Sequence, residues 1–139
     1  MSTYAENTYN YLKRKGIAQK YEHSGIYCIK INNRVVYIGK SMNMLRRIAE
    51  HYVGIKIKSN KKYKLLAQAR QNGNDIKFDV LYYAKGESYD IKFEEISNKE
   101  GEYIREYKPP LNAQIPKLED FRQYEYKEVN TEEFFQEIM

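Results

Sequence analysis

The sequence predicts an α+β fold, in which a small three-stranded antiparallel sheet is flanked by helices. Residues 25–31 and 34–39 are rich in isoleucine, valine and tyrosine and surround Asn32-Asn33, a pair that tolerates the positive φ of a hairpin turn. Residues 76–83 alternate apolar and polar side chains at their start, as a strand does. Segments with apolar residues at helical spacing lie before, between and after these strands, and this order implies an antiparallel sheet with packed helices.

Helices are expected around the strands, and most of them have a boundary signal. Gly16 weakens the end of the first helix, and Ser41 or Asn43 can cap the second. Pro109-Pro110 stops the last long helix, since proline cannot continue one. The expected ranges are residues 5–19, from Ser41 or Asn43 to about residue 52, about 61–71, about 89–107 and a short helix at 131–138.

Length and charge predict one domain with terminal extensions. The chain has 139 residues and a net charge of +5, but residues 1–116 hold 21 Lys and Arg against 12 Asp and Glu, whereas residues 117–139 hold 3 against 7. We expect an N-terminal helical extension over residues 1–23, a core domain over 24–112 and an acidic C-terminal tail over 113–139. The tail either contacts a partner protein or shields the basic body from nonspecific binding.

The composition excludes several classes of protein. A lone cysteine, Cys28, excludes an internal disulfide, and no Cys/His cluster has zinc spacing. We interpret His23 and Cys28 as structural. No apolar run approaches the length of a membrane span, which is about 20 residues. A soluble cytoplasmic protein with no membrane partner is therefore expected.

A basic body with 15 tyrosines favours nucleic acid as the partner, because lysines attract phosphates and aromatic rings contact bases. One stretch concentrates this charge between the second and third helices. It is either a solvated charge run or a patch that contacts the DNA backbone, and both readings stay open. Its members are Lys56, Lys58, Lys61, Lys62 and Lys64.

The hairpin carries two related tripeptides, Gly25-Ile26-Tyr27 and Tyr37-Ile38-Gly39. A plain two-residue turn at Asn32-Asn33 would place the two tyrosines on opposite faces of the sheet. A three-residue loop or a bulge would instead make Tyr27 face Tyr37 and Gly25 face Gly39, so that both hydroxyls serve one phosphate. We therefore predict that the turn is not a regular two-residue one.

The same register assigns the remaining hairpin residues. Glycine within a strand often marks close approach of another backbone, here that of the DNA phosphates. The face opposite the tyrosines is expected to supply the core, through Ile26, Cys28, Val36 and Ile38.

On the second helix, Arg47 and His51 are four residues apart and share one face. They are expected at the edge of the buried side, where a polar group reaches a cleft between helix and sheet. A solvated flank is the alternative interpretation. Arginine can stabilise charge on a phosphoryl group, and histidine can transfer or orient a proton.

These residues resemble the GIY-YIG endonuclease family over residues 24–112. Arg47 and His51 follow Gly39 by eight and twelve residues, Glu100 precedes Ile104 by four, and Pro110-Leu111-Asn112 closes the match. The resemblance implies the GIY-YIG nuclease fold and hydrolysis of a DNA phosphodiester by water, without a covalent enzyme intermediate.

The resemblance also implies roles for individual residues. Tyr27 is the expected general base, Tyr37 and Arg47 orient and stabilise the phosphoryl oxygens, and His51 assists proton transfer. Glu100 is the expected ligand of one Mg²⁺ or Mn²⁺, an ion that one carboxylate and water can hold. Gly25 and Gly39 are expected beside the site.

Three further residues have open roles. Lys40 is a phosphate contact, a cation that lowers the pKa of a tyrosine from its ordinary value of about 10, or an exposed lysine. Glu102 is the reserve metal ligand. Asn112 either holds the chain end against the site or is a turn residue.

A non-catalytic nucleic-acid-binding module or adaptor that retains the fold is the alternative function. Loss of Arg47 or Glu100 would favour it, but both positions are filled. No zinc finger or helix-turn-helix signature accompanies the domain, so specificity is expected from the N-terminal helix, the lysines, the tail or oligomerisation, or is slight. The oligomeric state stays open.

Overall fold

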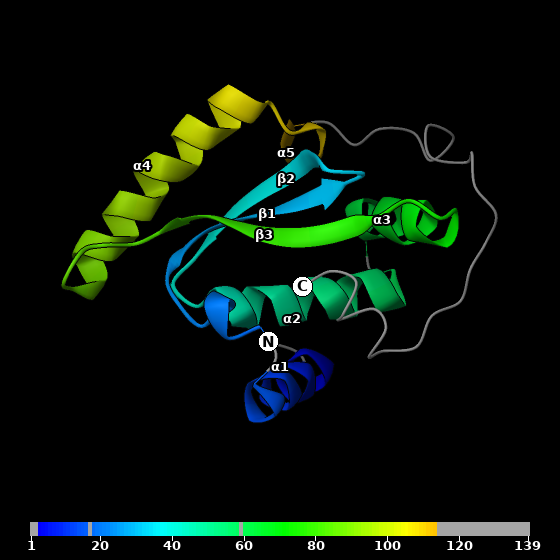
Figure 1. The fold of residues 1–139 in the computed structure, drawn as a ribbon, viewed down its shortest axis with the longest axis horizontal. Coiled ribbons are helices and arrows are strands. Elements are labelled where there is room, and N and C mark those ends of the chain that lie inside the picture. Colours follow the sequence, from blue (N-terminus) through cyan, green and yellow to red (C-terminus); the bar gives the residue numbers. More distant parts are fainter. Residues whose placement is uncertain (1–2, 17, 59, 114–139) are drawn as a thin grey trace.

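A computed structural model describes residues 3–16, 18–58 and 60–113 (Figure 1). Most of the acidic tail, with the helix expected at 131–138, lies outside the described residues. No helix in the described part of the chain is long and apolar enough to span a membrane. The elements are α1 (Thr3–Lys15), the 3₁₀ helix η1 (Gln19–Tyr21), β1 (Gly25–Ile31), β2 (Arg34–Ser41), α2 (Met44–Ile57), α3 (Lys61–Gln71), β3 (Ile76–Tyr83), α4 (Tyr89–Tyr107) and α5 (Pro110–Ala113).

The sheet has three antiparallel strands in the order β2-β1-β3, so the predicted fold class is confirmed. Two helices differ from their expected ends. The first stops at Lys15 because Gly16 adopts a φ of +66°, and α2 continues to Ile57 before Lys58 ends it in the left-handed region. Asn43, not Ser41, caps α2 by accepting a hydrogen bond from the Arg46 N–H.

The hairpin turn corrects the prediction made for it. Asn32 and Asn33 form a regular two-residue turn with φ values of +49° and +70°, the pattern of a type I′ hairpin. The shift in register comes later, from a bulge at Val36, which has no partner in β1. Tyr27 therefore pairs with Gly39, while Tyr37 pairs with Ile29.

The two tyrosines still lie on one face of the sheet, although neither faces the other. Their ring centroids are 6.4 Å apart. The expected pair of Gly25 with Gly39 is wrong, since Gly25 pairs with Ser41. Val36 was expected among the core residues of the opposite face and instead packs on the tyrosine side, because the bulge turns it there.

Helices cover both faces of the sheet (Figure 1). The tyrosine face packs against α2 and α3, and α1 packs against α2 on the side away from the sheet (Figure 1). All three helices join the main core, to which Leu12, Ile48 and Leu66 each contribute a fully buried side chain. The other face packs against α4 in a smaller core of Ile26, Cys28, Ile38 and Ile96, with partly buried neighbours. The first helix thus belongs to the main core, although it was expected as an extension.

The edge of β2 is closed by a side chain. Asn112 on α5 accepts a hydrogen bond from the Ile38 N–H and donates one to the Ile38 carbonyl, each over 2.8 Å. The amide thus makes the two bonds that a neighbouring strand would make. The helix α4 ends at Tyr107, before Pro109-Pro110 as expected, and Pro110 then begins the short helix α5, because proline is well accommodated at the first position of a helix.

Candidate active site

The centre of the candidate site is a hydrogen bond between Tyr27 on β1 and His51 on α2. The Tyr27 hydroxyl lies 2.6 Å from the Nε2 atom of His51. Tyr27 is 1% exposed and His51 is fully buried, so His51 lies deeper than the helix edge expected for it. Its depth follows from α3, which packs over α2 and covers that side of the helix.

Glycine at position 39 makes room for the Tyr27 ring. A Cβ atom built on Gly39 would collide with the hydroxyl and ring of Tyr27, coming 2.9 Å from Cε1. At Gly25 a Cβ atom would instead strike the backbone carbonyl of Tyr82 and come 3.0 Å from Cε of Met44. Packing within the protein therefore explains both glycines, which we had interpreted as room for a DNA phosphate.

His51 has a second hydrogen-bond partner that the sequence reasoning missed. The hydroxyl of Tyr63, on the first turn of α3, lies 2.8 Å from Nδ1 of His51. Gly54, one turn after His51, leaves space for the Tyr63 ring. A buried imidazole requires a partner at each nitrogen, and this rule could have led to a search for Tyr63 once His51 was placed in the core.

Tyr37 and Lys62 border this buried pair. The half-buried Tyr37 ring packs edge-on against His51 at 5.5 Å. The ammonium of Lys62 lies 4.3 Å from the centre of the Tyr37 ring and 4.8 Å from that of Tyr63. Of the five lysines in the basic stretch, Lys62 is the one that is half-buried at the site, while the others are exposed.

Arg47 is half-buried and forms an ion pair with Glu50 on the same helix. Its guanidinium also contacts Tyr27, where its charge and hydrogen bond favour the ionised tyrosine. The arginine therefore approaches the Tyr27 hydroxyl from α2, alongside the histidine.

Burial dominates the protonation of the centre. Burial, with a smaller contribution from Tyr37, raises the pKa of Tyr27 far above its ordinary value, and Arg47 only partly opposes this rise. Burial, Arg47 and Lys62 hold the pKa of His51 well below its ordinary value. Burial raises the pKa of Tyr63 to about 12. At neutral pH both tyrosines are protonated and His51 is neutral.

Lys40 is not among the groups that shift the pKa of Tyr27. It points to the α4 side of the sheet, where its ammonium donates to the Ser97 hydroxyl over 2.9 Å and lies 5.0 Å from the Phe93 ring centre. The cations that act on the buried centre are Arg47 and Lys62.

Glu100 lies on α4, which packs on the opposite face of the sheet from Tyr27 and Tyr37. It is one turn from the buried Ile96 and is itself half-buried. No hydrogen bond or ion pair joins it to Tyr27, Tyr37, Arg47 or His51 among the described residues. The edge strand β2 separates the two parts, so a ligand meeting both would have to lie across that edge.

The carboxylates of α4 differ in what they are free to bind. Glu95 accepts hydrogen bonds from the Tyr82 hydroxyl and the backbone of Lys85 and Gly86, and Glu102 pairs with Lys99 over 3.3 Å. Within the fully described α4, Glu100 is the half-buried carboxylate without a hydrogen bond or ion pair. No group of three metal-binding side chains occurs among the described residues, so Glu100 fits an ion that keeps its water and binds one carboxylate.

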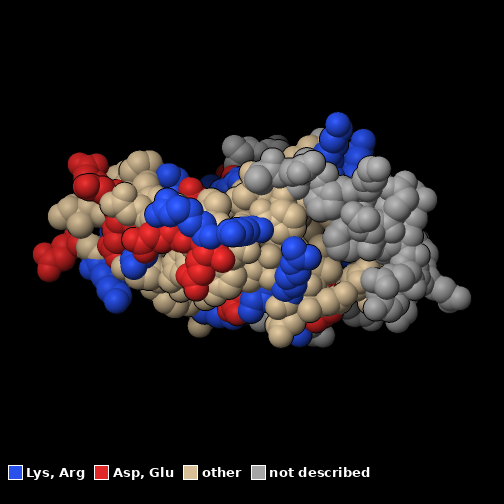
Figure 2. Space-filling view, turned by 90° about the horizontal axis from the view of Figure 1, so that it is seen from above, with Lys and Arg blue, Asp and Glu red and all other residues tan. Residues whose placement is uncertain are grey.

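The surface around α4 carries both signs of charge. Acidic and basic side chains are intermixed over the end of the molecule that α4 forms (Figure 2). This face is not a uniformly basic surface. Lys56, Lys58, Lys61 and Lys64 are exposed at the end of α2 and on α3.

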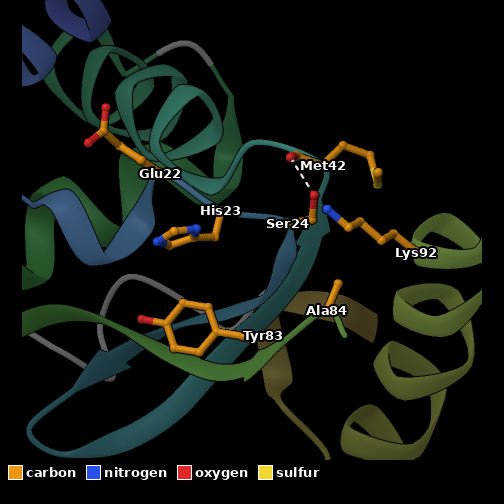
Figure 3. Close-up of a pocket in the computed structure, with 7 residues that line it drawn as sticks. All are labelled: Glu22, His23, Ser24, Met42, Tyr83, Ala84 and Lys92. Carbon is orange, nitrogen blue, oxygen red and sulfur yellow. Dashed lines mark hydrogen bonds between the residues drawn. The ribbon is translucent and has the colours of Figure 1, made fainter. Parts of the chain in front are cut away.

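A separate cavity of about 480 Å³ lies at the open end of the hairpin, away from the Asn32-Asn33 turn (Figure 3). Lys92 extends from α4 toward Ser24, which donates a hydrogen bond to the Met42 carbonyl over 2.8 Å. On the other side of the cavity, His23 packs edge-on against Tyr83 at 5.6 Å. None of the residues predicted to act in catalysis lines this cavity.

Comparison with known proteins adds one finding. The family model described as the GIY-YIG catalytic domain matches residues 23–113, well over half of the chain. Comparisons with curated proteins and with solved structures give no match. The matched range runs from His23 to the end of α5. It includes the buried centre, Glu100 and Asn112.

Proposed function

The chain belongs to the GIY-YIG catalytic-domain family, and from that premise we propose that it is a metal-dependent DNA endonuclease with Tyr27 as its general base. The family points to nucleases, and its nucleases act on DNA and are generally metal-dependent. The observation that carries the proposal for this chain is the hydrogen bond between the Tyr27 hydroxyl and His51, beside which the positive charge of Arg47 favours an ionised tyrosine.

As the general base, Tyr27 takes a proton from the water that attacks phosphorus. Tyr27 is protonated in the free protein, so it must first lose its own proton. His51 is neutral and lies 2.6 Å away, within hydrogen-bond reach, so it can take part in that transfer. Arg47 balances the negative charge of the phosphodiester, and its positive charge also favours the ionised form of Tyr27.

Tyr37, Arg47 and Lys62 are proposed to bind and orient the phosphodiester. Arg47 on α2 brings positive charge beside Tyr27, and Lys62 on α3 brings positive charge beside Tyr37. Fixed positive charge in a partly dry site lowers the energy of a phosphoryl transition state more than solvated charge does. The exposed lysines Lys56, Lys58, Lys61 and Lys64, together with Lys40 at the hairpin end, are proposed to contact the DNA backbone.

Glu100 would hold the metal ion, Mg²⁺ or Mn²⁺. When bound, such an ion supplies positive charge that stabilises the leaving oxygen. The half-buried setting and free carboxylate of Glu100 support this assignment. The proposal places the scissile phosphate across the β2 edge, so that it meets Tyr27 from one face and Glu100 from the other. Asn112 positions that edge through Ile38.

The domain limits and location of the protein remain proposals as well. We propose residues 24–112 as the nuclease domain, with an intracellular location where DNA is present. The burial of Tyr27 is the specific observation that favours the alternative, a DNA-binding module without catalysis, because a buried base must gain access to water before it can act.

A cleavage assay separates the two functions. Supercoiled plasmid, linear duplex and single-stranded DNA would be incubated with the full chain and Mg²⁺ or Mn²⁺. We expect cutting by the wild type, and a loss of about 100-fold or more in Tyr27→Phe and Glu100→Gln, as expected for a lost general base or metal ligand.

The controls are matched in chemistry to the two variants. Glu102→Gln removes an exposed α4 carboxylate, and Tyr21→Phe removes a buried hydroxyl that has no hydrogen-bond partner within the described chain. Both should cut DNA as the wild type does. DNA binding without metal-dependent cutting by the wild type would favour the non-catalytic module, and full activity in Glu100→Gln would rule out the metal assignment.

A further inference from the structure

The imidazole of His51 is held by a tyrosine hydroxyl at each nitrogen. Tyr27 lies 2.6 Å from Nε2, and Tyr63 lies 2.8 Å from Nδ1. The three rings also pack against one another, with centroids 5.4 Å apart for Tyr27 and His51 and 5.7 Å apart for His51 and Tyr63. The result is a continuous chain of three titratable groups from β1 through α2 to α3.

The direction of each hydrogen bond follows from what each group can donate. The Tyr27 hydroxyl is buried, and the Arg47 guanidinium near it can only donate, so the Tyr27 proton needs another acceptor. Within the described residues the acceptor at hydrogen-bond distance is His51 Nε2. A neutral imidazole with an unprotonated Nε2 carries its proton on Nδ1, and this N–H donates to the Tyr63 oxygen.

We propose that Tyr63 is a positioning residue that fixes the Nδ1–H tautomer of His51 and conducts the proton of Tyr27 toward solvent. This inference rests on the proposed function, in which Tyr27 must lose a proton before it accepts one from water. Tyr63 is 8% exposed and Tyr27 is 1% exposed, so the chain leads from the more buried tyrosine to the less buried one.

The transfer is balanced in protons and charge. The Tyr27 hydroxyl proton moves to Nε2 of His51, the Nδ1 proton moves to the Tyr63 oxygen, and the original Tyr63 proton passes to solvent water. The products are a Tyr27 phenolate, a neutral His51 that now donates from Nε2 to the phenolate, and a neutral Tyr63. His51 changes tautomer without becoming a stable cation, which suits the low pKa that its surroundings impose.

The groups around the chain favour this outcome. From α2, Arg47 faces Tyr27 and stabilises its phenolate, while Glu50 holds Arg47. From α3, Lys62 lies beside Tyr63, and from β2, Tyr37 faces His51. The residue from β3 at His51 is Phe78, whose ring is apolar and lies 6.1 Å away. The positive charges discourage a charged imidazolium and favour the anionic tyrosine.

Nuclear magnetic resonance of the imidazole nitrogens tests the tautomer directly. The chain has two histidines, so long-range ¹H–¹⁵N spectra of the full protein contain two ring systems. We expect wild-type His51 to be the Nδ1–H tautomer at neutral pH. In Tyr63→Phe, which keeps the ring but removes the acceptor, the Nε2–H tautomer should gain population. Tyr21→Phe is the control and should leave the spectrum of His51 unchanged.

Cleavage kinetics test the proton path. Tyr63→Phe should lower kcat by about tenfold or more with KM within about twofold of the wild type, because a step of proton transfer is lost and DNA contacts are not. Tyr21→Phe should leave both constants unchanged. A thermal unfolding scan of Tyr63→Phe checks that the variant is folded.

Either measurement can overturn the inference. An Nε2–H tautomer in the wild type, or an unchanged tautomer in Tyr63→Phe, removes the positioning role. An unchanged kcat in a folded Tyr63→Phe removes the proton path. If the wild type cuts no DNA at all, the proposed function fails, while the tautomer spectra still decide what Tyr63 does to His51.

Discussion

Replacing Gly39 by alanine tests whether packing against Tyr27 is the reason for glycine at that position. The backbone of Gly39 is not in the left-handed region that favours glycine, since among the described glycines only Gly16 and Gly73 have positive φ. The restriction is therefore steric. The new Cβ would overlap the Tyr27 hydroxyl and ring, which cannot retreat because it is buried and bonded to His51.

The expected cost of Gly39→Ala follows from two losses. Overpacking a core position costs about 1–3 kcal/mol. Displacing Tyr27 also leaves His51 Nε2 or the hydroxyl without a buried partner, which costs about 1–3 kcal/mol more. Alanine recovers roughly 0.5–1 kcal/mol that glycine loses in a strand interior. We expect a net destabilisation of about 1–5 kcal/mol, which compares with the roughly 5–15 kcal/mol of a typical domain.

Urea unfolding followed by circular dichroism measures this change, with Gly101→Ala as the matched control. Gly101 lies within α4, and the nearest atom to its added Cβ is the flexible end of Arg105 at 3.4 Å. Alanine there should stabilise the protein by roughly 0.5–1 kcal/mol through helix propensity. If Gly39→Ala is as stable as the wild type, the Tyr27 ring does not rest on Gly39 and the packing argument is wrong.

Three further predictions concern the sheet edge, an ion pair and the metal. Asn112→Ala removes both bonds to Ile38 and should lower the free energy of unfolding by about 1–3 kcal/mol, whereas Asn98→Ala on the exposed side of α4 should change it little; equal effects would contradict the edge role. Burial alone would raise the pKa of Asp79. The ion pair and hydrogen bond with Lys30, together with a hydrogen bond from the Val80 N–H, instead hold this pKa below its ordinary value. The folded-state pKa is depressed, so the stability that Asp79 contributes is present above its unfolded pKa of about 4 and lost as pH falls through the folded value, and urea unfolding of Asp79→Asn should approach that of the wild type at acid pH. A chelator should abolish cleavage and leave the thermal unfolding midpoint unchanged, because the described residues hold no metal cluster that supports the fold; a fall in the midpoint would mean that an ion is structural.

The fold could be predicted from the sequence because local signals agree with the final structure. The asparagine turn, the asparagine cap and the alternation of β3 each act over a few residues. The family match over residues 23–113 also confirms the resemblance seen in the two tripeptides. The end of α4 at Tyr107 agrees with the prediction, whereas boundaries failed where a single residue decides the outcome, as when Lys58 rather than a residue near 52 ends α2.

The candidate site could be predicted only in part. Helical spacing predicted a shared face for Arg47 and His51, and the need for both hydroxyls to serve one phosphate predicted a shared face for Tyr27 and Tyr37. The structure brings these four residues together. The burial of His51 and its bond to Tyr63 depend on how α3 packs, which no pattern within α2 reveals. The face on which each β2 side chain lies depends on the bulge, whose position has no signal in a run of two valines.

The bulge at Val36 decides whether an even or an odd separation along the chain puts the two tyrosines on the same side of the sheet. A two-residue turn and ten residues of separation would send Tyr27 and Tyr37 to opposite sides, and one unpaired residue restores them to the same side. Deleting Val36 would leave a regular ladder with nine residues of separation, in which Tyr27 would still pair with Gly39 and Tyr37 with Ile29, so both tyrosines would stay on one side. A hairpin with eleven residues of separation would reach the same side without any bulge. Turn length, spacing and bulge therefore cannot vary independently in a chain that keeps both tyrosines beside one histidine.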